Sequence, residues 1–439
     1  MNENTGKLRT IGEAHKEEKM ILPDGSLFSM DGIKTRLNNN VIVLATSGGG
    51  KTRSTVIPNI LSAVGSYVIS DPKGTLYRRY SQHLSNCGYR IVHIDLIHPE
   101  RSDCWNPFET INTSDEILRF AHQLVYSDKF GNFRGDPFWD RASELLLTAL
   151  IGYLVETKDR KAEIPTIDDL IKLTRLIDAE EMYDSHTCEF DTEMETHNRI
   201  YKALYDDESW AYSQWQKFKT TPTKTMDTIM VTMHVLFNMF DTREMRHLLQ
   251  KDDVHPATIG QEPTAVFVEI SDTDRSKDIA ANIFYGQVMH ELCDYADSLP
   301  ENRLPVPVRF ILDDFGTNVR IEGFENMISN IRSRGISAMV VIQSLAQLKS
   351  GYGESAQTIV DNCDTLLYMG GRDETTVKLI SRVSGRPFLK IMEMPTGMHW
   401  KIQRGRPAEY CETVDLSRYD LGFLRRRPVR DKKQETSDK

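Results

Sequence analysis

Short apolar runs alternate with stretches of helical spacing in two separated blocks of this sequence. The runs are rich in β-branched residues, and in the first block each ends near a polar residue, as strands of a parallel sheet do. They fall at residues 41–44, 67–70 and 90–94 in the first block, and at 265–270, 309–312, 338–342 and 365–369 in the second. Short strands separated by helices predict an α/β fold, a doubly wound sheet with right-handed crossovers.

Between the two blocks, over residues 113–261, the strand signals nearly vanish. Apolar residues there recur at helical spacing, most clearly over Ser143–Glu156 and Lys224–Phe240. This region predicts an all-α domain inserted into the α/β domain. We therefore expect the α/β domain to be built from residues 1–112 and 262–423, with the insertion at 113–261 and a basic, disordered tail at 424–439.

The composition is that of an ordinary globular protein, with 439 residues of which 39% are hydrophobic. No run of about 18 apolar residues occurs, and the N-terminus is polar and charged, so the sequence predicts neither a membrane span nor a secretory signal. It favours a cytoplasmic protein. Six cysteines lie far apart without a Cys-x-x-Cys pair, which argues against zinc ribbons and suits reduced thiols.

The net charge of -10 is unevenly distributed. Residues 159–208 carry 15 acidic and 6 basic side chains, which accounts for nearly all of the excess. Near the C-terminus, by contrast, residues 425–433 carry six Lys or Arg side chains against Asp431. Such a basic segment is typical of a solvated tail, with contact to a phosphate or a partner as the alternative.

The segment Val41–Thr52, VIVLATSGGGKT, carries the most specific chemistry in the sequence. It matches the phosphate-loop pattern G-x-x-x-x-G-K-[ST], except that Ala45 holds the first glycine position. A flexible glycine loop is the alternative. It is disfavoured because a strand precedes the turn and a helix is predicted over residues 53–61, although Pro58 must shorten or kink that helix.

We therefore expect ATP to bind at this loop, and the α/β domain to be a nucleotide-binding domain. Backbone N–H groups of the glycines would face the phosphates at a helix N-terminus, Lys51 would reach the β and γ phosphates, and the Thr52 hydroxyl would ligate Mg²⁺. The residues predicted to hold the nucleotide are Ser47, Gly48, Gly49, Gly50, Lys51 and Thr52.

Two acidic residues follow the predicted strand VRFIL, at Asp313 and Asp314. In a hydrolytic site the first acid would hold the metal and the second would polarise the attacking water. Two acids after a strand also occur as helix caps or turn formers. The phosphate loop in the same chain favours the catalytic interpretation.

The segment after these acids contains Arg332, Arg334 and a strand that ends at Gln343. A glutamine at that position can sense the γ-phosphate by hydrogen bonding, and an arginine before the strand can point across a subunit interface at a neighbour's nucleotide. Local sequence alone leaves open whether either arginine is an ordinary surface residue.

Taken together, these segments resemble the type IV coupling proteins, the TraG/TraD-like ATPases of conjugation and type IV secretion. The matching text covers roughly residues 41–386 and includes GGGKTRSTVIPNIL, SYVISDPKGTLYRRYSQHL, CWNPFE, FILDDF, SRGISAMVVIQSLAQLKSGYG and DNCDTLLYMGGRDETTVKLIS. The DPKG motif and the glutamines after the strand at 338–342 are specific to that family.

The resemblance implies a RecA-like P-loop domain with an all-α insertion, and a hexamer that hydrolyses ATP to move single-stranded DNA toward a secretion channel. By motif, Asp313 would bind Mg²⁺, Asp314 stands where the family usually has glutamate, Gln343 would be the γ-phosphate sensor, and Arg332 would be a finger acting on the neighbouring subunit. The implied partners are single-stranded DNA, relaxase or relaxosome proteins, channel components and, because the family's usual transmembrane helices are missing, a separate membrane anchor.

Three departures qualify the resemblance: Ala45, Asp314 and the missing transmembrane helices. Aspartate is one methylene shorter than glutamate, so turnover is expected to be slow.

Two other functions stay open. One is a double-stranded DNA translocase of the FtsK/HerA kind, which would not be expected to carry this insertion. The other is a docking platform for the relaxosome that binds ATP without hydrolysing it.

Overall fold

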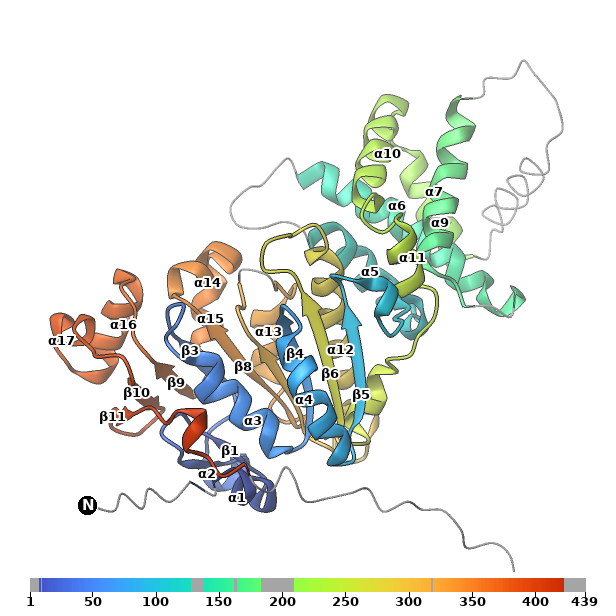
Figure 1. Cartoon of the computed structure of the whole chain (residues 1–439). Coiled ribbons are helices and arrows are strands. Elements are labelled where there is room, and N and C mark those ends of the chain that lie inside the picture. The colour runs from blue at the N-terminus through green and yellow to red at the C-terminus, as the bar shows by residue number, and fades with distance from the viewer. Residues whose placement is uncertain are drawn as a thin grey trace, which may run out of the picture.

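The computed structural model describes residues 8, 10–127, 137–161, 164–182, 209–316 and 319–421 (Figure 1). Within them, the main sheet has nine strands in the order β11-β10-β9-β3-β8-β7-β4-β6-β5. The strands from β9 to β5 are parallel. Their bounds are β3 (Val41–Leu44), β4 (Ser66–Pro72), β5 (Arg90–Asp95), β6 (Thr264–Ile270), β7 (Val308–Leu312), β8 (Ile336–Ile342) and β9 (Thr365–Tyr368). Each lies where the apolar pattern predicts a strand.

The sheet is buried on both faces because its strands alternate apolar residues toward two separate cores. Val41 and Val43 of β3 pack into one core, and Ile42 and Leu44 pack into the other. The first core is covered by α1 (Thr10–Glu17), α3 (Ile57–Ser62) and α4 (Thr75–Asn86). The second is covered by α12 (Asp278–Ser298), α13 (Phe324–Asn330), α14 (Leu345–Tyr352), α15 (Ala356–Asp361) and α16 (Glu374–Ser384). Helices on both faces of a parallel sheet are the predicted doubly wound arrangement.

Strand register brings the candidate residues to one edge of the sheet. Leu44 of β3 pairs with Ile342 of β8, and Leu312 of β7 pairs with Val340 of β8. The segments that follow these three strands therefore leave the sheet side by side at its carboxyl edge. They carry the phosphate loop, Gln343 and the Asp313–Asp314 pair.

The segment after the phosphate loop is not a regular α-helix. Residues Thr52–Val56 form a π-helical turn in which the Ile57 N–H donates to the Thr52 carbonyl, and α3 begins directly after it. Pro58 stands at the start of α3, where its missing N–H costs least. The predicted effect of Pro58 thus takes the form of a wide turn before a short helix.

Two hairpins were not predicted from the sequence. β10 (Met398–Gln403) runs antiparallel to β9 and pairs with β11 (Glu409–Glu412), while β1 (Lys19–Ile21) and β2 (Leu27–Ser29) form a separate small sheet. β1 and β2 have only three residues each, and β1, β10 and β11 mix charged residues with apolar ones. Every residue of β11 is at least partly exposed. Their sequences therefore lack the continuous apolar run that marks the parallel strands.

Between β5 and β6 the described residues form helices and no strand. Figure 1 shows these helices gathered beyond β5, at one end of the molecule. They are α5 (Ser114–Tyr126), α6 (Pro137–Lys161), α7 (Ile167–Met182), α9 (Trp210–Lys219), α10 (Thr223–Phe237) and α11 (Arg243–Leu248). The boundaries assigned to the insertion stay a prediction. The acidic stretch 159–208 lies largely outside the described residues, and the basic tail lies wholly outside them.

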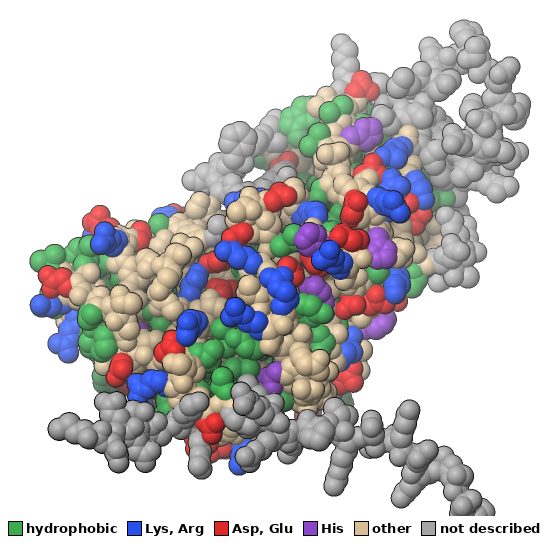
Figure 2. Space-filling view, in the orientation of Figure 1, with side chains coloured by type: hydrophobic (Ala, Val, Ile, Leu, Met, Phe, Trp, Pro, Cys, Tyr) green, Lys and Arg blue, Asp and Glu red, His purple; other side chains and the backbone are tan. Residues whose placement is uncertain are grey.

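The short elements α2 (Gly32–Thr35) and α17 (Phe388–Met392) complete the α-helices of the described residues. None of the described helices is both long enough and apolar enough to span a bilayer. Among the described residues, no two cysteines are joined by a disulfide. On the face shown in Figure 2, acidic and basic side chains of the described residues are interspersed, without one large patch of either sign.

Candidate functional site

The phosphate loop has a backbone that only glycine adopts easily. Gly48 and Gly50 have φ angles of 78° and 84°, which L side chains rarely adopt. At Gly49 a Cβ atom would stand 3.0 Å from the Thr46 carbonyl oxygen and 3.3 Å from the Ala45 Cβ. The buried methyl group of Ala45 therefore packs against the loop where the motif usually has glycine. Ser47 lies exposed at the tip of the turn.

Lys51 and Thr52 meet the two acids that follow β7. The Thr52 hydroxyl donates to Asp313 Oδ2 at 2.7 Å. The Lys51 ammonium forms an ion pair with Asp314, and its Nζ lies 3.8 Å from Asp313 Oδ1. The structure thus brings together four predicted residues from two segments more than two hundred positions apart.

The two acids have different environments. Asp313 is only 5% exposed, and this burial raises the pKa of its carboxyl, opposed by the charge of Lys51 and the hydrogen bond from Thr52. Asp314 is partly exposed and has a φ of 53°, a left-handed conformation that aspartate tolerates better than most residues. Its N–H donates to Asp313 Oδ1 at 3.0 Å, which holds the turn. Asp313 is therefore fixed deep in the site, and Asp314 lies nearer to solvent.

Gln343 lies at the carboxyl edge, directly after β8, and is exposed. Its backbone N–H donates at 2.9 Å to the side-chain oxygen of Gln347, one turn further along in α14. Ser344 caps the same helix by accepting from the Gln347 N–H. This hydrogen bond joins the two glutamines of the predicted motif at the carboxyl end of β8, the strand that lies between β3 and β7.

Arg332 lies at the opposite edge of the sheet, in the turn between α13 and the amino end of β8. Its guanidinium is exposed and donates to the Gly32 carbonyl at 3.0 Å. Arg334 has a firmer partner, a bidentate contact with Asp297 at 2.8 and 2.6 Å. The structure therefore does not bring Arg332 to the phosphate loop of its own chain.

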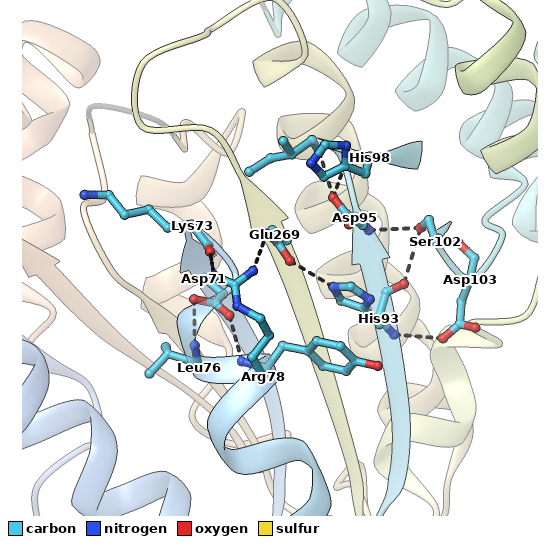
Figure 3. A network of polar contacts seen from close by, with 12 residues as sticks. Asp71, Lys73, Leu76, Arg78, His93, Asp95, His98, Ser102, Asp103 and Glu269 are labelled. Carbon is cyan, nitrogen blue, oxygen red and sulfur yellow. Dashed lines mark hydrogen bonds and ion pairs between the residues drawn. The ribbon is translucent and has the colours of Figure 1, made fainter. Parts of the chain in front are cut away.

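The DPKG motif forms a second polar network beside this site (Figure 3). The Asp71 carboxylate caps α4 by accepting from the N–H groups of Leu76 and Tyr77 at 3.0 and 2.8 Å. Burial, reinforced by the charge of Glu269, raises the pKa of Asp71 to about 6. A Cβ at Gly74 would stand 2.0 Å from the Glu269 carboxyl group, so a larger residue here would displace Glu269, and the φ of 62° would add strain.

Glu269 connects three strands of the network. It is opposite Asp71 of β4 and Asp95 of β5 in the sheet register, and it contacts His93 at 3.2 Å and Arg78 at 3.4 Å. Figure 3 shows these side chains converging on the carboxyl ends of β4, β5 and β6. The network fixes the turn that carries Lys73.

Lys73 was assigned no role from the sequence. Its ammonium pairs with Asp272 at 2.8 Å, and the pKa of the lysine is raised by the hydrogen bond to Asp272 and then by the charges of Asp272 and Asp314. Lys73 has a backbone φ of 81°, which L residues rarely adopt, and its side chain is exposed. The signal in the sequence that could have singled out Lys73 is the DPKG motif, which contains it. This motif stands at the end of β4, and β4 pairs directly with β7, the strand that precedes Asp313.

A phosphate loop after β3, two acids after β7, which is separated from β3 by β8 in the same parallel sheet, and helices on both faces define a RecA-like P-loop protein of the α/β class. The solved structure of the plasmid coupling protein TrwB in complex with ADP and Mg²⁺ has the same fold, with a TM-score of 0.64 and 15% identity over 93% of this chain and 94% of TrwB. VirB4 of Thermoanaerobacter pseudethanolicus is more distant, with a TM-score of 0.53 and 14% identity over 94% of this chain and 98% of that one.

The family model of the type IV secretory system conjugative DNA transfer proteins matches residues 3–392, so the chain belongs to this family. The conjugal transfer protein TraG of Escherichia coli is 22% identical over 370 residues, covering 79% of this chain and 55% of TraG. VirD4 of Rhizobium rhizogenes is 23% identical over 355 residues, covering 78% and 49%. The chain thus spans about half the length of these relatives.

Proposed function

We propose that this chain is the coupling ATPase of a type IV conjugation system, which binds ATP with Mg²⁺ and uses its hydrolysis to move DNA. The observation that carries the proposal is the convergence of Lys51, Thr52, Asp313 and Asp314 at one sheet edge. Membership of the conjugative DNA transfer family and the fold shared with TrwB, whose structure contains ADP and Mg²⁺, support it.

The residues of the site fit a magnesium nucleotide. The Thr52 hydroxyl and the Asp313 carboxylate place two oxygen atoms 2.7 Å apart, and oxygen is the ligand that Mg²⁺ prefers. The Lys51 ammonium has three N–H donors and now faces the two acids, and these donors would turn to the β and γ phosphates when the magnesium nucleotide binds. Bound Mg²⁺ would withdraw charge from the phosphates during their cleavage.

Asp314 would orient and polarise the attacking water, and Gln343 would sense the γ-phosphate. We propose single-stranded DNA as the transported strand, relaxosome and channel proteins as partners, a homohexamer as the active form and a separate membrane anchor. The substrate and these partners rest on family membership.

Asp313 and Asp314 should differ in the step that they serve. Asp313→Ala should weaken Mg²⁺-nucleotide affinity roughly 10–100-fold, because a charged ligand of the metal is lost. Asp314→Ala should bind nucleotide normally but lose roughly 100-fold or more in kcat, as expected for a group that acts on the attacking water. Nucleotide titration and steady-state ATPase rates check both, with Asp361→Ala, an exposed acid at the end of α15, as the matched control. Normal kcat in Asp314→Ala would require another base.

Steady-state ATPase activity with and without DNA separates the proposed function from its alternatives. We expect turnover that single-stranded DNA stimulates. Stimulation only by double-stranded DNA would favour a translocase of the FtsK/HerA kind. Tight ATP binding without turnover under either condition would favour a docking platform, an outcome consistent with Asp314 in place of glutamate.

A further inference from the structure

A group of side chains of the types that bind metal ions lies away from the nucleotide site, at the sheet edge formed by β10 and β11. One ligand atom each from Asp24, His399 and Cys411 lie within 4.8 Å of one another. His399 and Cys411 are directly opposite each other in the β10·β11 pair, and Asp24 stands in the turn between β1 and β2. Two segments from opposite ends of the chain therefore supply the group.

His399 presents a buried nitrogen without a partner. The side chain is fully buried, its Nδ1 lies 3.0 Å from the Thr413 hydroxyl, and no described group hydrogen bonds to its Nε2. The tautomer that donates Nδ1–H to this hydroxyl carries a lone pair on Nε2. In metal-binding histidines the ring nitrogen that does not bind the metal usually donates a hydrogen bond, which fixes the orientation of the ring.

A second buried polar atom without a partner among the described residues lies beside the turn that carries Asp24. This atom is the hydroxyl oxygen of Tyr419, which lies near Gly25, in the same turn as Asp24. Buried polar atoms without partners are rare, and unfilled ligand positions are one of their causes.

The charges around the group favour a divalent cation. Lys401 lies between Asp24 and Glu409, at 2.8 and 2.9 Å, so two carboxylates share one ammonium. The excess negative charge favours a cation at this place. A divalent ion bound by the Cys411 sulfur would release the thiol proton to solvent.

We propose that Asp24, His399 and Cys411 bind one Zn²⁺ ion, which ties the β1–β2 turn to the β10–β11 hairpin. Oxygen, imidazole nitrogen and thiolate together form a ligand set typical of zinc. Zinc bonds of about 2.0–2.3 Å place tetrahedral ligand atoms about 3.3–3.8 Å apart, so the side chains need to close by no more than about 1.5 Å. The fourth position is open to water.

The test is the metal content of the purified full chain, measured by mass spectrometry after dialysis against Zn²⁺ and then against buffer. We expect one zinc ion per chain in the wild type, and none in Cys411→Ser or His399→Gln. Replacing zinc with Co²⁺ should give a thiolate-to-cobalt absorption band in the near ultraviolet. The matched control is Cys87→Ser, because Cys87 is exposed and its sulfur lies 3.8 Å from His83 Nε2, yet it stands outside the group. This variant should keep both the zinc and the band.

Thr413→Val provides a second variant that leaves all three ligands in place. It should weaken zinc affinity roughly 10–100-fold, measured by competition with a chromophoric chelator, because the hydrogen bond that orients His399 is lost. Circular dichroism establishes that each variant is folded. The proposal would be overturned if the wild-type protein bound no zinc and gave no cobalt band. It would also be overturned if Cys87→Ser lost the zinc while folded Cys411→Ser retained it.

Discussion

Lys51→Ala should weaken ATP binding by at least roughly 100-fold and abolish DNA transfer. Charge-assisted hydrogen bonds contribute about 1.5–3 kcal/mol each, and the lysine would donate to both the β and γ phosphates. The structure adds a second reason. Without Lys51, the carboxylates of Asp313 and Asp314 would face the incoming phosphates without the cation that now contacts both of them. Isothermal titration with a non-hydrolysable ATP analogue measures the loss.

The matched control for this variant is Lys349→Ala. Lys349 is an exposed lysine on α14 that pairs with Glu354 at 3.1 Å, so its loss should leave the nucleotide affinity unchanged. Thr52→Ser keeps the hydroxyl that contacts Asp313 and should retain binding. A folded Lys51→Ala protein with unaltered nucleotide affinity would remove the central claim about this site.

The parts of the site that the sequence predicted are those governed by local backbone rules. A strand, a glycine turn and Lys51-Thr52 form a continuous segment whose chemistry is visible in one window. Asp313 and Asp314 were found for a similar reason, because an apolar strand runs directly into them. The two segments meet where the Thr52 hydroxyl donates to the Asp313 carboxylate at 2.7 Å. This contact follows from the parallel register of the strands, and neither segment predicts it alone.

The parts that the sequence did not predict depend on tertiary context. Lys73 acquires its position from a strained turn that Asp71 and Glu269 hold, and these two residues are almost two hundred positions apart. The β10–β11 hairpin is stabilised by pairing with β9 and by packing of Trp400, which a period-two pattern in so short a segment does not reveal. The zinc ligands Asp24 and Cys411 are likewise joined only by the fold.

Hydrolysis should depend on Arg332 only in an assembled ring. Within one chain, Arg332 lies at the amino end of β8 and the phosphate loop lies at the carboxyl edge, so the guanidinium cannot reach its own nucleotide. Its guanidinium donates to the Gly32 carbonyl, and the side chain is exposed, so a neighbouring subunit could contact it. The ATPase rate per subunit should therefore rise with protein concentration, and single-stranded DNA that threads and stabilises a ring should increase it further.

Mixing two inactive variants tests this directly. Arg332→Ala subunits keep an intact phosphate loop and Lys51→Ala subunits keep an intact finger, so a mixed ring contains some interfaces that hold both. ATPase activity should return on mixing, although each variant alone is inactive. Arg334→Ala is the matched control, because Arg334 is two residues away and is engaged by Asp297, so this variant should stay active alone. No recovery on mixing, together with a rate per subunit that is independent of concentration, would instead indicate a monomeric nucleotide-binding module, since Arg332 cannot reach the phosphate loop of its own chain.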